Sequence, residues 1–180
     1  MIRLLPEPTI VGADIGAVVA SAGFTAERPV PAGPASPEQW SWVHPDGTAV
    51  TWVLDGIVGF AYVVVEGTHE RQAAELVGAR LTMVDWRAAL VELQAAESWD
   101  VIVEAVYRLV LAAPAESVPP VAAAVTGLAA HEHPTVRQAA YVAIMYLGWP
   151  ALMPLVRAAA DDDPDPQNRA LARSLVPTTG

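Results

Sequence analysis

The stretch Trp40–Val65, WSWVHPDGTAVTWVLDGIVGFAYVVV, contains three runs of strand-favouring residues separated by two short turn sequences. Trp, Val, Ile, Thr and Tyr dominate the runs, and such side chains suit the half-buried surface of a sheet. The turns contain Pro45-Asp46-Gly47 and Asp55-Gly56, and Asp-Gly is a strong hairpin signal because both residues tolerate positive φ. We therefore predict a three-stranded antiparallel meander with strands at Trp40–His44, Thr48–Leu54 and Ile57–Val65.

Before the meander, the sequence predicts one helix and one extended connector. Apolar residues recur at helical spacing from Asp14 to Ala22, so we expect Asp14 to cap this helix and Gly23 to end it. The following segment, Arg28–Pro37, contains four prolines and is expected to be extended.

After Gly67 the sequence is helical in pattern. The clearest case begins at Trp99, where apolar residues recur at i, i+3, i+4 and i+7 up to Ala113. We expect helices at His69–Arg80, Trp86–Ala96, Trp99–Ala113, Val118–Ala130, Thr135–Leu147, Ala151–Ala160 and Gln167–Val176. The expected organisation is an N-terminal part, residues 1–67, and a helical part, residues 68–180, that together form one compact unit.

The helical part contains a repeated pattern. The segment His133-Pro134-Thr135-Val136-Arg137 is followed by a similar start at Asp165-Pro166-Gln167-Asn168-Arg169, and Leu147–Leu155 has the Pro and Leu pattern of a second repeat helix. These features resemble HEAT-type (armadillo-like) helical repeats over about residues 98–176. The resemblance implies stacked helix pairs that present a surface to a protein partner, with Arg137 tying neighbouring repeats together.

The resulting fold class is α+β, with a small N-terminal antiparallel meander and its capping helix packed on a HEAT-like helical array. Two helical stretches, 117–130 and 138–153, contain no charged residue. A helix that is apolar on all sides needs cover. We expect the sheet to cover these helices with its Trp-bearing face, and the alternative is a protein partner or a second copy of the chain.

Composition restricts the classes of function. The 180 residues include 10 Lys+Arg and 20 Asp+Glu, a net charge of −10, and no Cys. Disulfides and thiolate chemistry are therefore excluded, and all ten cations are Arg, which excludes lysine Schiff bases. A strongly acidic chain disfavours nucleic acid as a partner. No stretch has the pattern of a membrane span or a secretory signal, so we expect a cytoplasmic protein without a membrane partner.

The first candidate binding residues lie on the predicted sheet: Trp40, Trp42, Trp52 and His44. Trp40 and Trp42 share a strand face, His44 continues it, and Trp52 lies across the hairpin. They would form an aromatic wall for a small apolar ligand or peptide, and ordinary core packing is the favoured alternative. His44 with Asp55, Glu66 and Glu70 would be the acid–base groups of such a site.

The second candidate set is Tyr141, Met145 and Trp149 on the helical part. Tyr141 and Met145 follow Arg137 at helical spacing, so a partner helix or loop would lie along this row, with core packing as an equal alternative. Arg137 is expected to be exposed.

Two sequence clusters resemble metal sites without matching one. His131-Glu132-His133 offers two imidazoles but no third ligand, and a solvated loop is the better interpretation. Asp161-Asp162-Asp163 with Asp165 lacks the spacing of a calcium loop, so we expect Asp165 to cap a helix that begins with Pro166. We predict no metal and no cofactor.

No catalytic motif is present: there is no nucleophile elbow, dinucleotide fingerprint or phosphate loop. The sequence therefore favours a non-enzymatic interaction module, of a regulatory or immunity type, that binds a protein partner or itself through its helical repeats. The alternative is a small enzyme or ligand-binding protein of specialised metabolism, with a Trp-rich pocket between sheet and helices.

Overall fold

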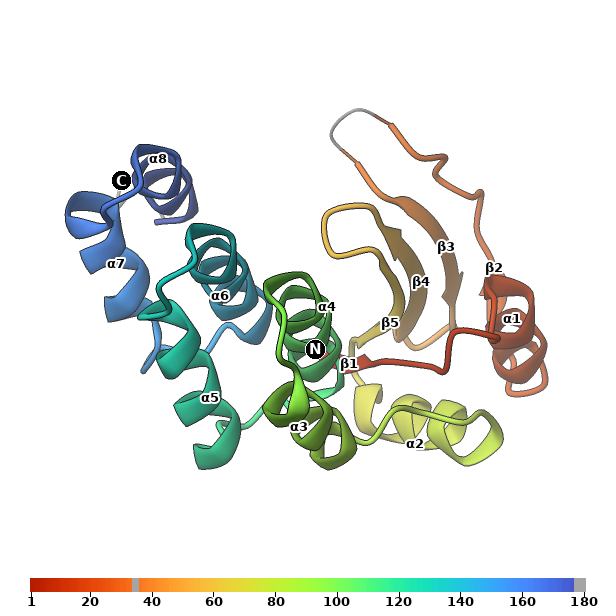
Figure 1. Cartoon of the computed structure of the whole chain (residues 1–180). Coiled ribbons are helices and arrows are strands. Elements are labelled where there is room, and N and C mark those ends of the chain that lie inside the picture. Colours follow the sequence, from red (N-terminus) through yellow and green to blue (C-terminus); the bar gives the residue numbers. More distant parts are fainter. Residues whose placement is uncertain (34–35, 177–180) are drawn as a thin grey trace. The chain divides into compact units, whose positions relative to one another are not determined.

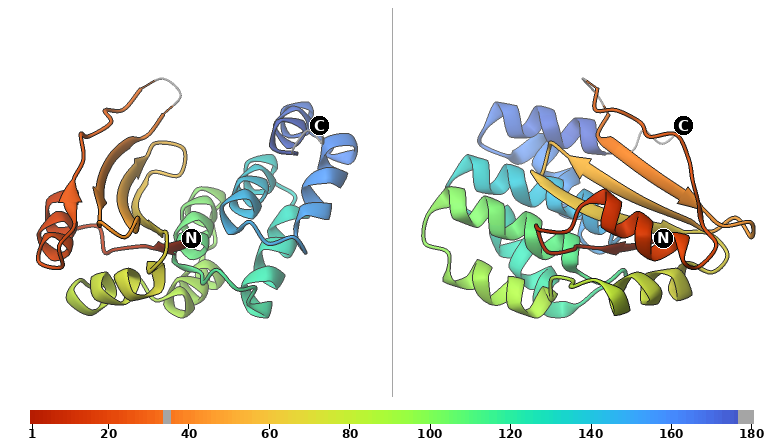
Figure 2. Two further views of the ribbon diagram at one scale, coloured as in Figure 1. Left: turned by 180° about the vertical axis from the view of Figure 1, so that it is seen from behind. Right: turned by 90° about the vertical axis from the view of Figure 1, so that its right-hand side faces the viewer.

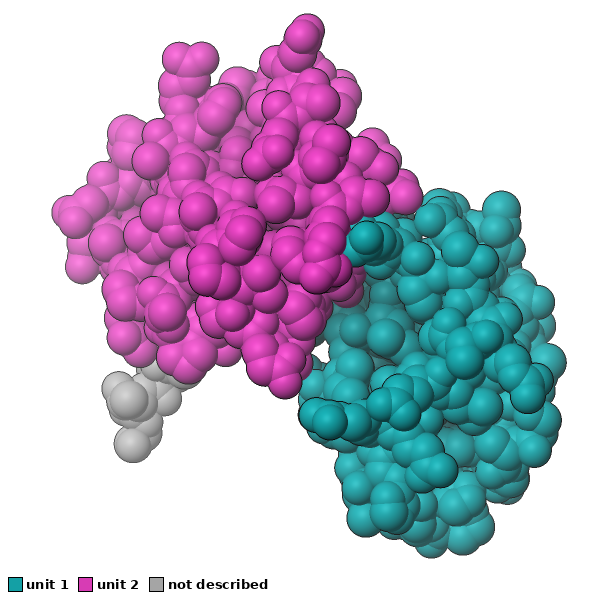
Figure 3. All heavy atoms as spheres, turned by 90° about the horizontal axis from the view of Figure 1, so that it is seen from below, with its two compact units in different colours: residues 1–85 teal, residues 86–180 magenta. Residues whose placement is uncertain are grey.

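A computed structural model defines residues 1–33 and 36–176 of the chain. The chain divides into two compact units, Met1–Asp85 and Trp86–Gly180, called the first and second unit below (Figures 1 and 3). Within the described residues, the first unit has a five-stranded antiparallel sheet and two helices, and the second has six helices. The expected α+β class is therefore confirmed. The first unit extends beyond Gly67 because the helix that follows the sheet packs on it.

The predicted meander is confirmed as strands β3, β4 and β5, and two short edge strands are added to it. The order across the sheet is β1-β5-β4-β3-β2. The strands are β1 (Ile2–Leu4), β2 (Thr25–Ala26), β3 (Glu38–Val43), β4 (Ala49–Asp55) and β5 (Phe60–Glu66). The sequence did not predict the edge strands, because two or three residues carry no recognisable alternation.

The turn between β4 and β5 is longer than expected. Ile57, predicted to begin a strand, lies in the turn, where its N–H donates to Asp55 Oδ1 at 2.9 Å. The Gly59 N–H donates to Asp55 O at 2.9 Å, and Gly59 has a φ of +74°. A single aspartate thus organises this turn, and β5 begins only at Phe60.

Helices α1 (Gly12–Ala20) and α2 (Glu70–Arg80) cover one face of the sheet (Figure 1). Trp42, Val50 and Val63 of the sheet belong to the same buried cluster as residues of both helices. The helix residues in this cluster are Ile15, Val19, Ala73, Ala74 and Val77. The Trp-bearing face is therefore covered within the first unit, and not by the C-terminal helices as we expected.

The start of α1 differs from the prediction. Val11 occupies the N-cap position, and Asp14 lies in the first turn, where its Oδ2 accepts the Val11 N–H at 2.9 Å. Asp14 thus satisfies a free N–H from inside the helix. A glycine further along α1 allows close packing, because a Cβ on Gly16 would lie 2.8 Å from Cζ2 of Trp42.

The second unit consists of three helix pairs joined by short loops. The helices are α3 (Trp86–Ala95), α4 (Trp99–Ala112), α5 (Pro119–Ala129), α6 (Pro134–Leu147), α7 (Met153–Asp162) and α8 (Pro166–Leu175). The two helices of each pair pack on each other, α4 also packs on α6, and α6 packs on α8 (Figure 2). Every one of these helices was predicted from the sequence, and the observed helix ends differ from the predicted ends by at most two residues.

The two charge-free helical stretches are accommodated in different ways. Helix α6 packs against α4, α5, α7 and α8, so its own unit surrounds it. Helix α5 buries Val121 and Val125 and exposes the small residues Ala123, Thr126 and Gly127. Small side chains present little apolar area to water, so this outer helix needs less cover than its lack of charge suggested.

Two expectations concern the chain as a whole. Within residues 1–33 and 36–176, no helix is long and apolar enough to cross a membrane. Positions 34 and 35 of the predicted connector Arg28–Pro37 lie outside the described residues. On either side of them, Val30 pairs with Gln39 of β3 in an isolated bridge, so part of the connector runs beside the sheet.

Candidate functional site

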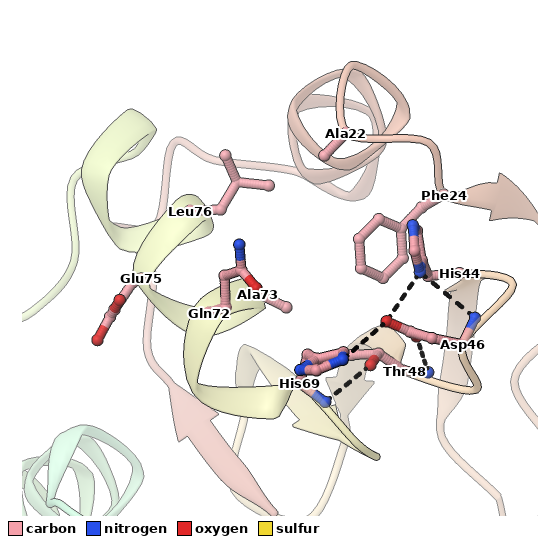
Figure 4. Close-up of a pocket in the computed structure, with 10 residues that line it drawn as sticks. All are labelled: Ala22, Phe24, His44, Asp46, Thr48, His69, Gln72, Ala73, Glu75 and Leu76. Atoms are coloured by element: carbon pink, nitrogen blue, oxygen red, sulfur yellow. Dashed lines mark hydrogen bonds and ion pairs between the residues drawn. The ribbon is translucent and has the colours of Figure 1, made fainter.

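A pocket of about 430 Å³ lies in the first unit, where the end of α1, the β3–β4 turn and the first half of α2 meet (Figure 4). This volume is within the range of sites for small organic ligands. The lining residues are Ala22, Phe24, His44, Asp46, Thr48, His69, Gln72, Ala73, Glu75 and Leu76.

Asp46 is the polar centre of this pocket. It lies in the predicted Pro45-Asp46-Gly47 turn, and its Oδ1 accepts the Thr48 N–H at 2.8 Å. This backbone hydrogen bond, with smaller contributions from the Thr48 and His44 side chains, lowers the pKa of Asp46 to about 2. The carboxylate is therefore ionised at any physiological pH.

Two imidazoles flank the Asp46 carboxylate (Figure 4). Oδ2 lies 3.0 Å from Nδ1 of His44 and 3.7 Å from Nε2 of His69. The Asp46 N–H also approaches Nδ1 of His44, at the longer distance of 3.4 Å. Because the contact with the carboxylate is shorter and charge-assisted, we assign the neutral His44 proton to Nδ1. Its Nε2 is then left as a hydrogen-bond acceptor.

Hydrogen bonds between the β3–β4 turn and the start of α2 fix the positions of His44 and His69 relative to each other. The His69 N–H donates to Oγ1 of the buried Thr48 at 3.0 Å, and Thr68 Oγ1 donates to Asp46 O at 3.3 Å. Gly67, with a φ of +110°, passes so close to Gly47 that any side chain there would collide with its backbone. The start of α2 is thus tied to the β3–β4 turn, and the site is preformed.

The remaining walls of the pocket are mostly apolar. The ring of Phe24 lies 5.2 Å from that of His44, centroid to centroid, at an angle of 48°. Ala22, Ala73 and Leu76 add apolar surface, and the Gln72 amide extends toward the cavity (Figure 4). The pocket thus combines one fixed carboxylate with an aromatic and aliphatic wall.

Of the predicted tryptophan wall, Trp42 and Trp52 are buried in the core, whereas Trp40 is half-buried and lines a separate concavity with residues 28–32. Trp40 and Trp52 are direct cross-strand partners with ring centroids 6.3 Å apart in an edge-to-face arrangement, and Trp42 packs on Gly16. The Trp40 indole N–H donates to Glu38 Oε1 at 2.9 Å, whereas that of Trp52 is buried with no partner among the described residues. None of the three lines the pocket. Of the four candidates on the sheet, only His44 does.

A second concavity, of about 580 Å³, lies in the second unit along α5, the α5–α6 loop and α7, and is called the α5–α7 groove below. Its lining residues are Thr126, Ala129, Ala130, His131, Glu132, Arg137, Tyr141, Leu155, Ala158, Ala159, Asp162, Asp163 and Pro164. Four alanines make its walls smooth, and the exposed carboxylates of Glu132 and Asp162 lie on it.

The floor of the groove is a buried ion pair. Arg137, which we expected to be exposed, is only 8% exposed. Its Nε and one terminal nitrogen donate to the two oxygens of Asp163, both at 2.9 Å, and the other donates to the backbone O of His131 and Glu132. The hydrogen bonds from Arg137 hold the pKa of Asp163 well below its usual range.

Tyr141 belongs to this buried network, so its side chain is not available on the surface for a protein partner. It is 3% exposed, and its hydroxyl donates to Asp163 Oδ2 at 2.6 Å. Trp149 is also 3% exposed, and its indole N–H donates to Ala115 O at 2.9 Å. Met145 is half-buried and, like Trp149, is absent from the groove lining. The expected row of three binding residues is therefore not brought together at a surface.

The two metal-like clusters have structural roles. His131 Nδ1 accepts the His133 N–H at 3.0 Å, and the His133 ring stacks on Trp99 with centroids 4.9 Å apart. Asp165 caps α8 as predicted, accepting from the N–H groups of Gln167 and Asn168. In the part of the chain that the structure describes, no group of three His, Asp or Glu side chains is arranged to hold a metal ion.

Sequence reasoning missed Asp46 and His69 as companions of His44. The expected companion Asp55 instead accepts from the Tyr62 hydroxyl at 3.2 Å, and Glu70 contacts the N-terminal amine. A signal for this convergence was available in the sequence. In a meander, the end of β3, the start of β4 and the end of β5 all lie at the same end of the sheet. The register Val43–Ala49–Glu66 has this property, so residues just beyond those ends converge.

Comparisons with known proteins supply no family. No family model, no curated protein and no solved structure matches the chain.

Proposed function

We propose that this protein is an interaction module of a regulatory or immunity type, which binds a basic segment of a protein partner in the α5–α7 groove. The observation that carries the proposal is the groove itself: an open concavity of about 580 Å³ in which the accessible carboxylates, Glu132 and Asp162, have no compensating exposed cation among the described lining residues.

Charge supports a basic partner. The only arginine in the described lining is Arg137, and its charge is neutralised by the ion pair with the buried Asp163. Glu132 and Asp162 are therefore the uncompensated charges of the lining; Arg169 adds one cation beside it, where it donates to the backbone O of Asp163 and Pro164, and the net charge of the whole chain is −10. Complementary charge accelerates association and excludes acidic partners more than it adds affinity.

Shape supports a side chain as the bound element. The walls of Ala129, Ala130, Ala158 and Ala159 leave room for the aliphatic part of an arginine or lysine, whose charged end would reach the rim. The Arg137–Asp163–Tyr141 network beneath them is rigid because each polar group is paired. A preformed floor lowers the entropic cost of binding.

The helix arrangement supports the proposed HEAT-type character of this unit. Helices α3 to α8 form consecutive pairs, and every second helix, α4, α6 and α8, packs on the next. Stacked pairs of this kind bury a continuous core and leave an extended surface for partners. Arg137 of α6 bonds to Asp163 after α7, which suits a residue that ties one pair to the next.

The test is a charge reversal in the groove with a matched control. The pair Glu132→Arg and Asp162→Arg is compared with Glu97→Arg and Glu104→Arg, which are exposed, lie in the same unit and change the net charge equally. Each protein is cross-linked in extract of its native host, and cross-linked peptides are identified by mass spectrometry. We expect a stoichiometric partner whose basic segment is linked to residues 129–132 or 158–164.

Loss of that partner by about tenfold in the groove variant, with retention by the control, would support the proposal. Equal retention by both variants would exclude the groove, and a partner linked through an acidic segment would exclude the charge argument.

A further inference from the structure

The pocket of the first unit carries an inference of its own, independent of the α5–α7 groove. We infer that this pocket is a binding site for a small amphipathic amine, a protonated primary or secondary amino group on an aromatic or branched apolar body. The ammonium group would lie at Asp46 and Gln72, and the apolar body against Phe24, Ala22 and Leu76.

The polar end of the pocket is built to accept hydrogen bonds. Asp46 is an ionised carboxylate, and it holds the His44 Nδ1–H, so that His44 Nε2 is a lone-pair acceptor. None of the described lining residues is an arginine, and the carboxylate of Glu75, another lining residue, extends away from Asp46 on the other side of α2 (Figure 4). A ligand that donates hydrogen bonds and carries positive charge is therefore complementary, whereas an organic anion lacks a fixed counter-charge.

The apolar end favours a ligand with a hydrophobic body. Phe24 and His44 form a tilted aromatic pair at 5.2 Å, and a cation close to an aromatic face gains further attraction. The lining alanines Ala22 and Ala73 keep the cavity wide at this end. Its volume of about 430 Å³ is sufficient for a simple arylalkylamine.

The histidines make binding depend on pH in a defined direction. The ionisable residues of the described lining are His44 and Asp46 from the β3–β4 turn, and His69 and Glu75 from the start of α2, of which Glu75 extends away from Asp46 (Figure 4); the segment after α1 contributes Ala22 and Phe24. Protonation of either imidazole would add positive charge beside the Asp46 carboxylate. Amine affinity should therefore fall as the pH decreases, and carboxylate affinity should rise.

Three probes of similar size and different charge test the ligand class: phenethylamine, phenethyl alcohol and 3-phenylpropionate. Each is titrated into the full-length protein at pH 7.5 and at pH 5.5, and binding is followed by calorimetry and by the NMR shifts of backbone amides. We expect phenethylamine to bind at least about tenfold more tightly than phenethyl alcohol at pH 7.5, with the largest shifts at residues 44–48 and 69–76.

Two variants locate the site. Asp46→Asn keeps an oxygen for the Thr48 N–H and removes the charge, so the preference for the amine over the alcohol should disappear. Glu27→Gln removes an exposed carboxylate of the same unit outside the pocket, and it should leave the preference intact. Tighter binding of 3-phenylpropionate at pH 7.5 would overturn the amine class. Absence of shifts in the pocket with all three probes at about 10 mM would overturn the site.

Discussion

Each unit contains a carboxylate with a lowered pKa, and the two differ in their accessibility to solvent. Asp163 is sealed in the second unit beneath Arg137 and Tyr141, with all its contacts made inside the protein. Asp46 lines a pocket in the first unit and is exposed between the imidazoles of His44 and His69. A lowered pKa by itself therefore does not distinguish a structural group from a binding group; accessibility of the charge does.

The largest expected effect comes from breaking the sealed pair. Asp163→Ala leaves Arg137 buried without its partner, so we expect the free energy of unfolding to fall by about 3–5 kcal/mol. Urea unfolding followed by circular dichroism measures this change. Asp162→Ala, an exposed neighbour, serves as the control and should change stability by less than about 0.5 kcal/mol. A small effect for Asp163→Ala would mean that the pair is solvated.

A smaller effect is expected from glycines that differ in their surroundings. Gly16→Ala would place a Cβ 2.8 Å from Trp42 Cζ2, so it should cost about 1–3 kcal/mol despite the better helix propensity of alanine. Gly127→Ala in α5 meets nothing within 4 Å and should stabilise by about 0.5–1 kcal/mol. Thermal unfolding of both variants decides the comparison, and stabilisation by Gly16→Ala would show that α1 packs loosely on the sheet.

The dependence of stability on pH below about pH 4 tests the charge of Asp163 separately from the packing that is lost in Asp163→Ala. Its pKa is lowered in the folded state, so its contribution is complete above the unfolded value of about 3.9 and is lost as the pH falls below it. The stability difference between wild type and Asp163→Ala should shrink by about 1.4 kcal/mol per pH unit below about pH 4. A difference for Asp163→Ala that does not change with pH would contradict the ionised pair.

The smallest effect on stability is expected for a substitution of Asp46, the carboxylate that is exposed to solvent. Asp46→Asn retains an acceptor for the Thr48 N–H and removes a solvent-exposed charge whose lowered pKa contributes some stability, so the unfolding midpoint should fall slightly and far less than for Asp163→Ala. The same variant should change ligand preference, as described above. A strongly destabilised Asp46→Asn would instead place Asp46 among the structural groups with Asp163.

Most of the fold was predictable because local signals agreed. Asp-Gly turns between β-type runs located β3, β4 and β5, and helical periodicity with Pro and Asp at the starts located the helices. The failures have local causes as well. The edge strands β1 and β2 are too short to carry a pattern, and Asp14 has an equally good role at the third helical position as at the cap.

The candidate site was predictable only in part. His44 was selected because it continues a strand face, and it does line the pocket. The tryptophans beside it were candidates only because their chemistry suits both a binding wall and a core, and the choice depends on what lies over them. Gly12 and Gly16 of α1 lie over them, at contact distances that no strand pattern reveals.

The sequence alone determined the chemistry available to this protein: an acidic chain without cysteine or lysine, a β-meander, a series of helices, and the turn that carries His44 and Asp46. Tertiary structure alone decided which of these groups are accessible. Arg137 and Asp163 are separated by most of two helices, yet they share two hydrogen bonds in the interior. His69 meets Asp46 only because the segment after β5 returns to the β3–β4 turn. Burial depends on contacts between residues distant in sequence, and a local pattern such as the one that led us to expect an exposed Arg137 does not specify them.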